Sequence, residues 1–318
     1  MQSIFKRYEQ KHLVTREQAA ALAGAFSRRM APDRYGEYLV QNLYYDTAGW
    51  DVVRASIEKP VYKEKLRLRC YGVPNRESKA FLELKKKYRG VVYKRRIAFP
   101  AQALGGGTVR AIVSRDSSQI GRELDFYMRA NPVSERMYIS YLRTALAGEA
   151  GGPEAGLRVT FDTDVRFRLD LLDYAHPGDG WGALPSDRAL MEIKTLGGMP
   201  MWMARALCEN GAFPAGFSKY GACYAAIAGL RRGLGHPACS DYADYTDKHL
   251  NFPLTRVSNT RFLCPTANCG RNPNRTRVYP AYADYSGYAG VPDYMGHPDC
   301  SGRAANDAGA GRGDRAYA

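Results

Sequence analysis

Short stretches of the chain alternate strictly between polar and apolar residues. In KEKLRLRCYG, residues 63–72, Lys65, Arg67 and Arg69 occupy every second position, and apolar residues stand between them. Side chains alternate across a β-strand, so the three cations share one face and the apolar residues share the other. The stretch therefore predicts a strand with a cationic face, which in an isolated strand would ordinarily meet solvent.

Runs with the same period of two recur between turn-forming residues and predict about eight strands, mostly consecutive in the chain. The predicted strands are a short first strand followed by 38–47, 63–72, 80–99, 137–146, 157–169 and 189–195. The run 80–99 is long enough for a hairpin that turns at Arg89 and Gly90. Consecutive strands favour an antiparallel sheet or a closed barrel over a parallel βαβ fold.

Helical segments interrupt the predicted strands. They cover residues 14–33, 108–131, 199–211 and 218–232. Thr15 and Gln18 have the spacing of a capping box, and Gly211 is a typical helix stop. The predicted class is therefore α+β, a closed antiparallel barrel of about eight strands with flanking helices.

The composition changes at about Gly235, which divides the chain into a predicted domain, 1–234, and a tail, 235–318. The tail contains no Ile, Trp or Glu and is rich in Tyr, Asp, Ala, Gly and Pro. Such a low-complexity segment buries too little apolar surface to offset the entropy of ordering, so we predict a disordered or loosely structured tail.

Cysteine usage gives one further possibility in the tail. The chain has seven cysteines, and their spacing suggests no disulfide framework. GHPACS at 235–240 returns as GHPDCS at 296–301, so a zinc site is an alternative to a simple low-complexity repeat. Its ligands would come from His236, Cys239, Cys264, Cys269, His297 and Cys300.

The charge of the chain favours polyanionic partners. Forty-six lysines and arginines stand against 32 aspartates and glutamates, a formal net charge of +14. The first 234 residues hold 37 of these cations and 24 of the anions, so the excess lies in the predicted domain. The sequence contains no apolar stretch of membrane-spanning length and no signal-peptide pattern, which makes the cytoplasm the expected compartment and direct membrane insertion unexpected.

Charged rows like that of 63–72 recur on other predicted strands. Those rows are Glu9 and Lys11; Glu83, Lys85 and Lys87; Lys94 and Arg96; Glu192 and Lys194; and the polar row Arg158, Thr160, Asp162 and Asp164. Together they would give one sheet an entire face of Lys, Arg and Glu. Closing that sheet into a barrel would place cations and a few carboxylates inside, where a triphosphate and a divalent metal could neutralise them. A basic surface for nucleic acid is the competing interpretation.

The ordered motifs FKRYEQKHLVT, NLYYDT, KLRLRCYG, FLELKKKYRGVVYKRR, YLRTAL, LRVTFDTDVRFR, LMEIKT and FSKYGACYA resemble the VTC domain. This is the polyphosphate polymerase branch of the triphosphate tunnel metalloenzymes, the CYTH-like superfamily. The resemblance covers about residues 3 to 230 and does not reach the tail. It implies a barrel that encloses ATP and Mn²⁺ or Mg²⁺, and transfer of the γ-phosphoryl group to a growing polyphosphate chain with release of ADP.

The resemblance also implies roles for individual residues. Lys11, Arg67, Arg69 and Lys219 would act in catalysis, and Glu192 would hold the metal. The remaining phosphate-binding residues would be Lys85, Lys94, Arg96, Arg143 and Arg158. Lys65 stays undecided between the tunnel rim and solvent, and Lys86, Lys87 and Arg95 are expected as outer or rim charges.

One departure from the superfamily bears on the reaction. The first strand often carries Glu-x-Glu-x-Lys, whereas here only Glu9 precedes Lys11 and Arg7 takes the other position. Fewer carboxylates fit transfer to phosphate better than hydrolysis. The alternatives are an inorganic triphosphatase or adenylate cyclase on the same fold, or a non-catalytic polyanion or nucleic-acid binding module. ATP and polyphosphate or inorganic phosphate are the expected partners, and nucleic acid is not.

Overall fold

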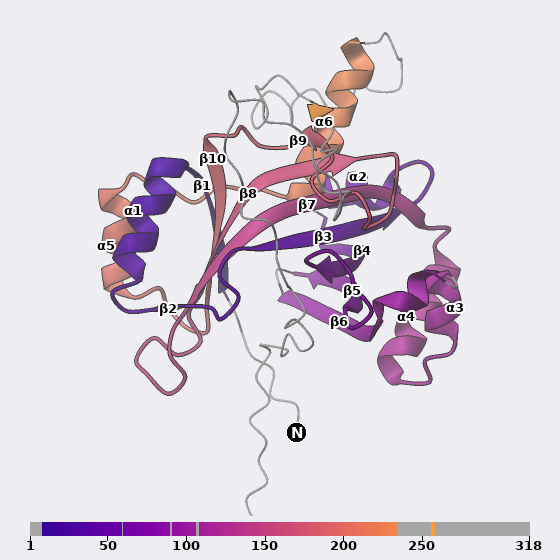
Figure 1. Ribbon diagram of the computed structural model, residues 1–318, viewed down its shortest axis with the longest axis horizontal. Coiled ribbons are helices and arrows are strands. Elements are labelled where there is room, and N and C mark those ends of the chain that lie inside the picture. Colours follow the sequence, from indigo (N-terminus) through magenta and orange to yellow (C-terminus); the bar gives the residue numbers. More distant parts are fainter. Residues whose placement is uncertain (1–7, 59, 90, 106–107, 234–255, 258–318) are drawn as a thin grey trace, which may run out of the picture.

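The computed structural model describes residues 8–58, 60–89, 91–105, 108–233 and 256–257 (Figure 1). Its strands form one antiparallel sheet. They are β1 (Tyr8–Thr15), β2 (Ala31–Pro32), β3 (Tyr38–Asp46), β4 (Tyr62–Tyr71), β5 (Lys79–Tyr88), β6 (Val91–Pro100), β7 (Ser134–Ala147), β8 (Arg158–Arg168), β9 (Gly180–Gly182), β10 (Arg188–Thr195) and β11 (Arg256–Val257). The helices are α1 (Arg16–Phe26), α2 (Asp51–Ile57), α3 (Val109–Ser114), α4 (Gln119–Ala130), α5 (Met201–Glu209) and α6 (Lys219–Gly233), with a 3-10 turn at Ala101–Gly105.

The order of strands in the sheet is β1-β10-β8-β7-β3-β4-β5-β6, with β2, β9 and β11 attached at the side. The predicted α+β class and antiparallel sheet are confirmed. The predicted closed barrel is not confirmed, because closure needs backbone hydrogen bonds between β6 and β1. Within the described part of the chain no such pairing joins the two ends of this order.

Local sequence signals explain where several elements begin and turn. Thr15 and Gln18 form the predicted capping box, in which Gln18 N donates to Thr15 Oγ1 and Thr15 N donates to Gln18 Oε1. The hairpin of β5 and β6 turns where predicted, and Arg89 there has a positive φ of 46°. Helix α2 begins after Trp50, whose backbone is in the left-handed region, and the sequence did not predict this helix.

Helices cover the apolar face of the sheet at both of its ends (Figure 1). Helices α1 and α5 pack on β1, β10 and β8 through residues such as Phe26, Met191 and Leu207. Helices α3 and α4 pack on β4, β5 and β6 through residues such as Leu66, Leu82 and Leu124. The apolar residues of 63–72 therefore lie under helices, as expected, and the charged residues face the other way.

Helix α6 lies on the opposite, charged face. Its Tyr220 stacks on Tyr44 of β3, with ring centroids 4.3 Å apart, and the Tyr220 hydroxyl donates to the buried Asp46 carboxylate at 2.7 Å. Because Tyr44 is the register partner of Arg67, this packing fixes the start of α6 against the charged row of β4.

The region from 235 onward, including the six candidate zinc ligands, lies outside the described residues apart from β11, which pairs with β9. The predicted division at 234 and 235 stays a prediction. Among the helices that the structure describes, none has the length and apolar character needed to cross a membrane.

Candidate functional site

The strand register brings the charged rows onto one continuous face of the sheet. On one side Lys11 of β1 lies opposite Glu192 of β10, which lies opposite Thr160 of β8. On the other side Glu83 of β5 lies between Arg67 of β4 and Arg96 of β6. Residues that are register partners point to the same side of a sheet, so the strand rows seen in the sequence merge into one surface.

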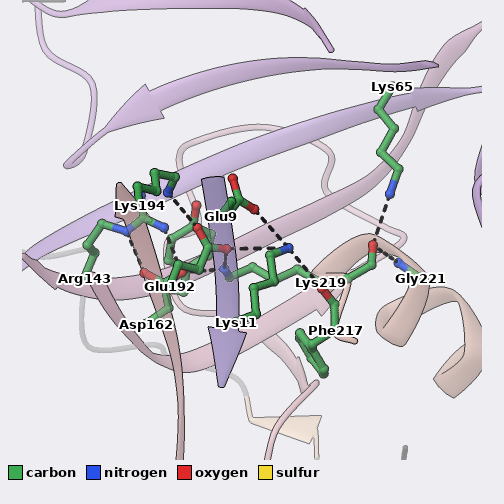
Figure 2. Close-up of polar contacts among 12 residues, drawn as sticks. Glu9, Lys11, Lys65, Arg143, Asp162, Glu192, Lys194, Phe217, Lys219 and Gly221 are labelled. Atoms are coloured by element: carbon green, nitrogen blue, oxygen red, sulfur yellow. Dashed lines mark hydrogen bonds and ion pairs between the residues drawn. The ribbon is translucent and has the colours of Figure 1, made fainter. Parts of the chain in front are cut away.

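The sheet curves until distant parts of this surface meet. Lys65 of β4 donates a hydrogen bond of 3.0 Å from Nζ to Oγ of Ser218, just before α6. Lys11 of β1 donates from Nζ to the carbonyl oxygen of Phe217 at 3.0 Å. Figure 2 shows these two lysines reaching the Phe217–Lys219 segment from different strands. The charged face is therefore drawn together around the start of α6.

The carboxylate of Glu83 is the centre of one group of charges. It is 2% exposed and contacts Arg67 Nε at 2.8 Å, Lys94 Nζ at 2.8 Å and Arg96 Nε at 2.7 Å. Burial alone would raise the pKa of Glu83, but the charges of Arg67 and its neighbouring cations hold that pKa well below its ordinary value. Glu83 is therefore an anion that fixes the positions of three cations.

The carboxylate of Asp162 is the centre of a second group. It is fully buried and accepts from Arg143 Nε at 2.6 Å and from a terminal guanidinium nitrogen of Arg143 at 2.7 Å. Lys219 Nζ also contacts Asp162. Burial would raise the pKa of Asp162, and Arg143 and Lys219 outweigh it and lower that pKa. The bidentate pair orients Arg143, while Lys219 is bound to β8 through Asp162.

Glu192 lies beside this second group and shares its cations at longer distances (Figure 2). It contacts Lys194 Nζ at 3.0 Å, Lys219 Nζ at 3.6 Å and Lys11 Nζ at 3.7 Å. Burial opposes ionisation, but Lys194, Lys219 and Lys11 hold the pKa of Glu192 well below its ordinary value. Lys11 is also 3.6 Å from Glu9, so it lies between two carboxylates.

Arg69 is held by neutral groups. Its Nε donates to Asn42 Oδ1 at 2.9 Å, and a terminal nitrogen donates to the Tyr141 hydroxyl at 3.1 Å. Another terminal nitrogen lies 3.5 Å from the Tyr71 hydroxyl. Burial would raise the pKa of Tyr71, and Arg69 outweighs burial and lowers that pKa to about 8. The Arg69 guanidinium thus keeps its net charge available to a ligand.

Lys65 and Lys85 lie on the charged face without a carboxylate partner among the described residues. Lys65 and Lys85 are register partners, and neither forms an ion pair with any residue that the structure describes. Burial, with Lys11 and Lys85 nearby, lowers the pKa of Lys65 to about 7. Burial and Lys11 also lower the pKa of Lys85, against the opposing effect of Glu9. This part of the face therefore has two amines that no carboxylate of the described residues contacts directly.

The structure gathers the residues that the resemblance implied on this one face. These are Lys11, Arg67, Arg69, Lys85, Lys94, Arg96, Arg143, Arg158, Glu192 and, from α6, Lys219. Arg158 pairs with Asp33 at 3.1 Å. Lys86 and Arg95 point to the other face, where both contact Glu123, at 2.6 Å and 2.9 Å, as expected of outer charges.

Sequence reasoning missed the roles of Asp162, Glu83 and Ser218. Asp162 and Glu83 stood in the charged rows, and their position among cations on neighbouring strands was the available signal. Ser218 gave no signal, because its contact with Lys65 spans 153 positions. The predicted polar row of β8 ends at Asp162, since Asp164 has a positive φ of 49° at an irregularity of the β7–β8 pairing.

The metal-binding capacity of this face rests on few donors. Among the described residues no cluster of three or more His, Cys, Asp or Glu side chains could hold an ion by itself. Mg²⁺ commonly binds through one or two carboxylates together with substrate phosphates and water. Glu192 fits that mode, because its oxygens are shared among lysines that a phosphate chain can also engage.

Several solved structures match this chain at low sequence identity. A protein from Pyrococcus horikoshii OT3 matches at 14% identity over 65% of this chain and 92% of its own, with a TM-score of 0.34. A protein described as a putative adenylate cyclase from Vibrio parahaemolyticus matches at 11% over 70% of this chain and 99% of its own, with a TM-score of 0.37. No curated protein matches the chain.

A comparison with protein-family models identifies the family of this chain. The model of the VTC domain matches residues 6–228, which include every strand from β1 to β10 and all the charged groups described above. The chain belongs to the VTC domain family.

Proposed function

We propose that the chain is a polyphosphate polymerase that uses a divalent metal ion, moves the γ-phosphoryl group of ATP to the end of a polyphosphate chain, and releases ADP. The observation that supports it best is the excess of cations on the charged face. After Glu83, Asp162 and Glu192 are counted, Lys65 and Lys85 still have no carboxylate partner among the described residues.

A chain of phosphates suits this charge distribution. Lys65 is half-buried and Lys85 is exposed. Cations gathered on one face without carboxylate partners repel one another, and a polyanion that supplies the counter-charges recovers that free energy. The guanidinium groups of Arg67 and Arg143 are each oriented by a carboxylate, which leaves the rest of their donors for phosphate oxygens. The charged rows of β4, β5 and β6 and those of β7 and β8 would bind successive phosphates.

Phosphoryl transfer needs alignment of donor and acceptor and stabilisation of charge, and little covalent work by the protein. In the proposed site Arg67, Arg69 and Arg143 hold and orient phosphate oxygens, and Lys11 and Lys219 neutralise charge near Glu192. Glu192 would hold the Mn²⁺ or Mg²⁺, which would supply positive charge to offset that of the phosphate oxygens. The acceptor is the terminal phosphate of the polymer, so no side-chain nucleophile is required.

Product analysis tests this proposal. Purified protein is incubated with ATP and Mn²⁺, and the products are separated by electrophoresis and chromatography. The polymerase gives a ladder of phosphate chains together with ADP. Orthophosphate without chains would indicate a triphosphatase, cyclic AMP with pyrophosphate a cyclase, and no turnover a binding module, and each of these results overturns the proposal. Lys79→Met, on an exposed part of β5, is the matched control and keeps the ladder.

A further inference from the structure

Lys65 has an unusual environment within the charged face. It lies two residues before Arg67 on β4 and opposite Lys85 on β5. Its Nζ donates at 3.0 Å to Ser218 Oγ (Figure 2), and that oxygen also accepts from Gly221 N at 3.2 Å in the first turn of α6. The Tyr220 ring centroid lies 6.0 Å from Nζ.

The four charged groups that act most strongly on Lys65 are all cations. Lys63 and Arg67 act from β4, Lys85 from β5 and Lys11 from β1, and the contacts of Lys65 at the start of α6 are with the neutral Tyr220 and Ser218. An ammonium group has three donors, and the described residues supply one acceptor. A charged Lys65 is therefore stabilised by little in the protein alone, and a phosphate beside it would supply both charge and acceptors.

We propose that Lys65 and Ser218 form a further phosphate position at the α6 side of the site, which fills as Lys65 takes up a proton from solvent. The inference rests on the proposed function, because the ligand is the same phosphate chain. The amine becomes an ammonium group when the anion arrives, and the Ser218 hydroxyl is then free to donate to a phosphate oxygen.

The direction in which phosphate binding depends on pH follows from the charges around Lys65. The folded protein without ligand has a Lys65 pKa of about 7, below its ordinary value, and a bound anion raises that pKa. Above about pH 7 binding therefore takes up close to one proton, and the affinity for phosphate chains falls as the pH rises, by at most about tenfold per pH unit. Below about pH 7 Lys65 is already protonated in the free protein, so binding takes up little further proton there.

Tyr71 of the same face also titrates in this range, so the number of protons that wild type takes up is not diagnostic alone. Tyr71 has a pKa of about 8, and Lys85 and Lys94 have lowered pKa values. The difference in proton uptake between wild type and a position-65 variant reports on Lys65. The protons exchanged by the ligand and by the other groups are the same in both proteins and cancel. An arginine at position 65 stays charged at every pH of interest, so it keeps the counter-charge and removes the titration.

Calorimetric titration with inorganic tripolyphosphate at pH 8, in two buffers of different ionisation enthalpy, measures the protons taken up. We expect Lys65→Arg to bind with about 0.9 fewer protons than wild type. Lys65→Met should show the same deficit with about fivefold weaker binding at pH 7, whereas Lys79→Met should match wild type. Equal proton uptake by wild type and both position-65 variants would overturn this inference and leave the proposed function standing. Absence of tripolyphosphate binding to wild type would overturn both.

Discussion

Glu83 and Glu192 are both buried glutamates that contact three cations on the same face, yet their surroundings differ. The cations of Glu83 come from register neighbours on β4 and β6, and each lies at 2.7–2.8 Å. Those of Glu192 come from β1, β10 and α6 at 3.0–3.7 Å, and two of them have a second carboxylate partner. Lys11 also contacts Glu9, and Lys219 also contacts Asp162.

The difference separates a carboxylate that holds the sheet together from one that is available for chemistry. Removing Glu83 leaves Arg67, Lys94 and Arg96 without their shared counter-charge. Removing Glu192 leaves Lys11 and Lys219 with other carboxylates. Lys194 loses its ion-pair partner, but its side chain is partly exposed, so we expect the protein to tolerate the loss while the proposed metal ligand disappears. The comparison therefore predicts opposite patterns of stability and activity for the two positions.

Glu83→Gln should have the largest effect on folding. Breaking a buried ion group by removing one partner costs about 3–5 kcal/mol, because the remaining charges stay buried. We expect the free energy of unfolding, measured by urea denaturation followed by circular dichroism, to fall by that amount. A loss below about 1 kcal/mol would show that the three cations do not depend on Glu83.

Glu192→Gln should change activity instead. We expect formation of phosphate chains from ATP and Mn²⁺ to fall by about 100-fold or more, as for the loss of a group that stabilises transition-state charge. The free energy of unfolding should stay within about 1 kcal/mol of wild type, since Asp162 and Glu9 still pair with the neighbouring lysines. If this variant formed phosphate chains at the wild-type rate, Glu192 would have no role in the reaction.

Acid should weaken the fold through both Glu83 and Asp162. Their pKa values are lowered in the folded protein, so the stability they contribute is complete above their unfolded pKa values of about 4 and is lost as the pH falls below them. The free energy of unfolding should fall by up to about 1.4 kcal/mol per pH unit for each carboxyl. Urea titrations at pH 6, 4 and 3 measure this fall, which should be shallower in Glu83→Gln; an identical slope in that variant would contradict the assignment to Glu83.

Glu123→Gln gives the smallest effect and a matched control on the outer face. Glu123 also contacts two cations, Lys86 at 2.6 Å and Arg95 at 2.9 Å, but all three side chains are partly exposed. Such pairs contribute about 0–1 kcal/mol. We expect unfolding within about 1 kcal/mol of wild type and an unchanged product ladder. A loss as large as that of Glu83→Gln would show that burial is not what distinguishes the two carboxylates.

The alternating pattern predicted much of this arrangement because a period of two determines which residues share a face. Arg67, Lys94 and Glu192 could be assigned to rows from their own strands, and Thr15 marked the start of α1. The contacts that complete the site could not be predicted from spacing. Lys219 reaches Asp162 across 57 positions, and Ser218 meets Lys65 only because the sheet curves. Barrel closure depends on pairing between the two edge strands, β1 and β6, which no local sequence pattern specifies.

We propose that the charged face, between β1, β4, β8 and the start of α6, binds a chain of phosphates. A crystal structure of the protein with inorganic tripolyphosphate would locate the bound ligand. We expect phosphate oxygens within hydrogen-bonding distance of Arg67, Arg143 and Lys219, with the ion pairs of Glu83 and Asp162 retained. Tripolyphosphate bound only on the outer face, near Lys86 and Arg95, with the charged face unchanged, would contradict it.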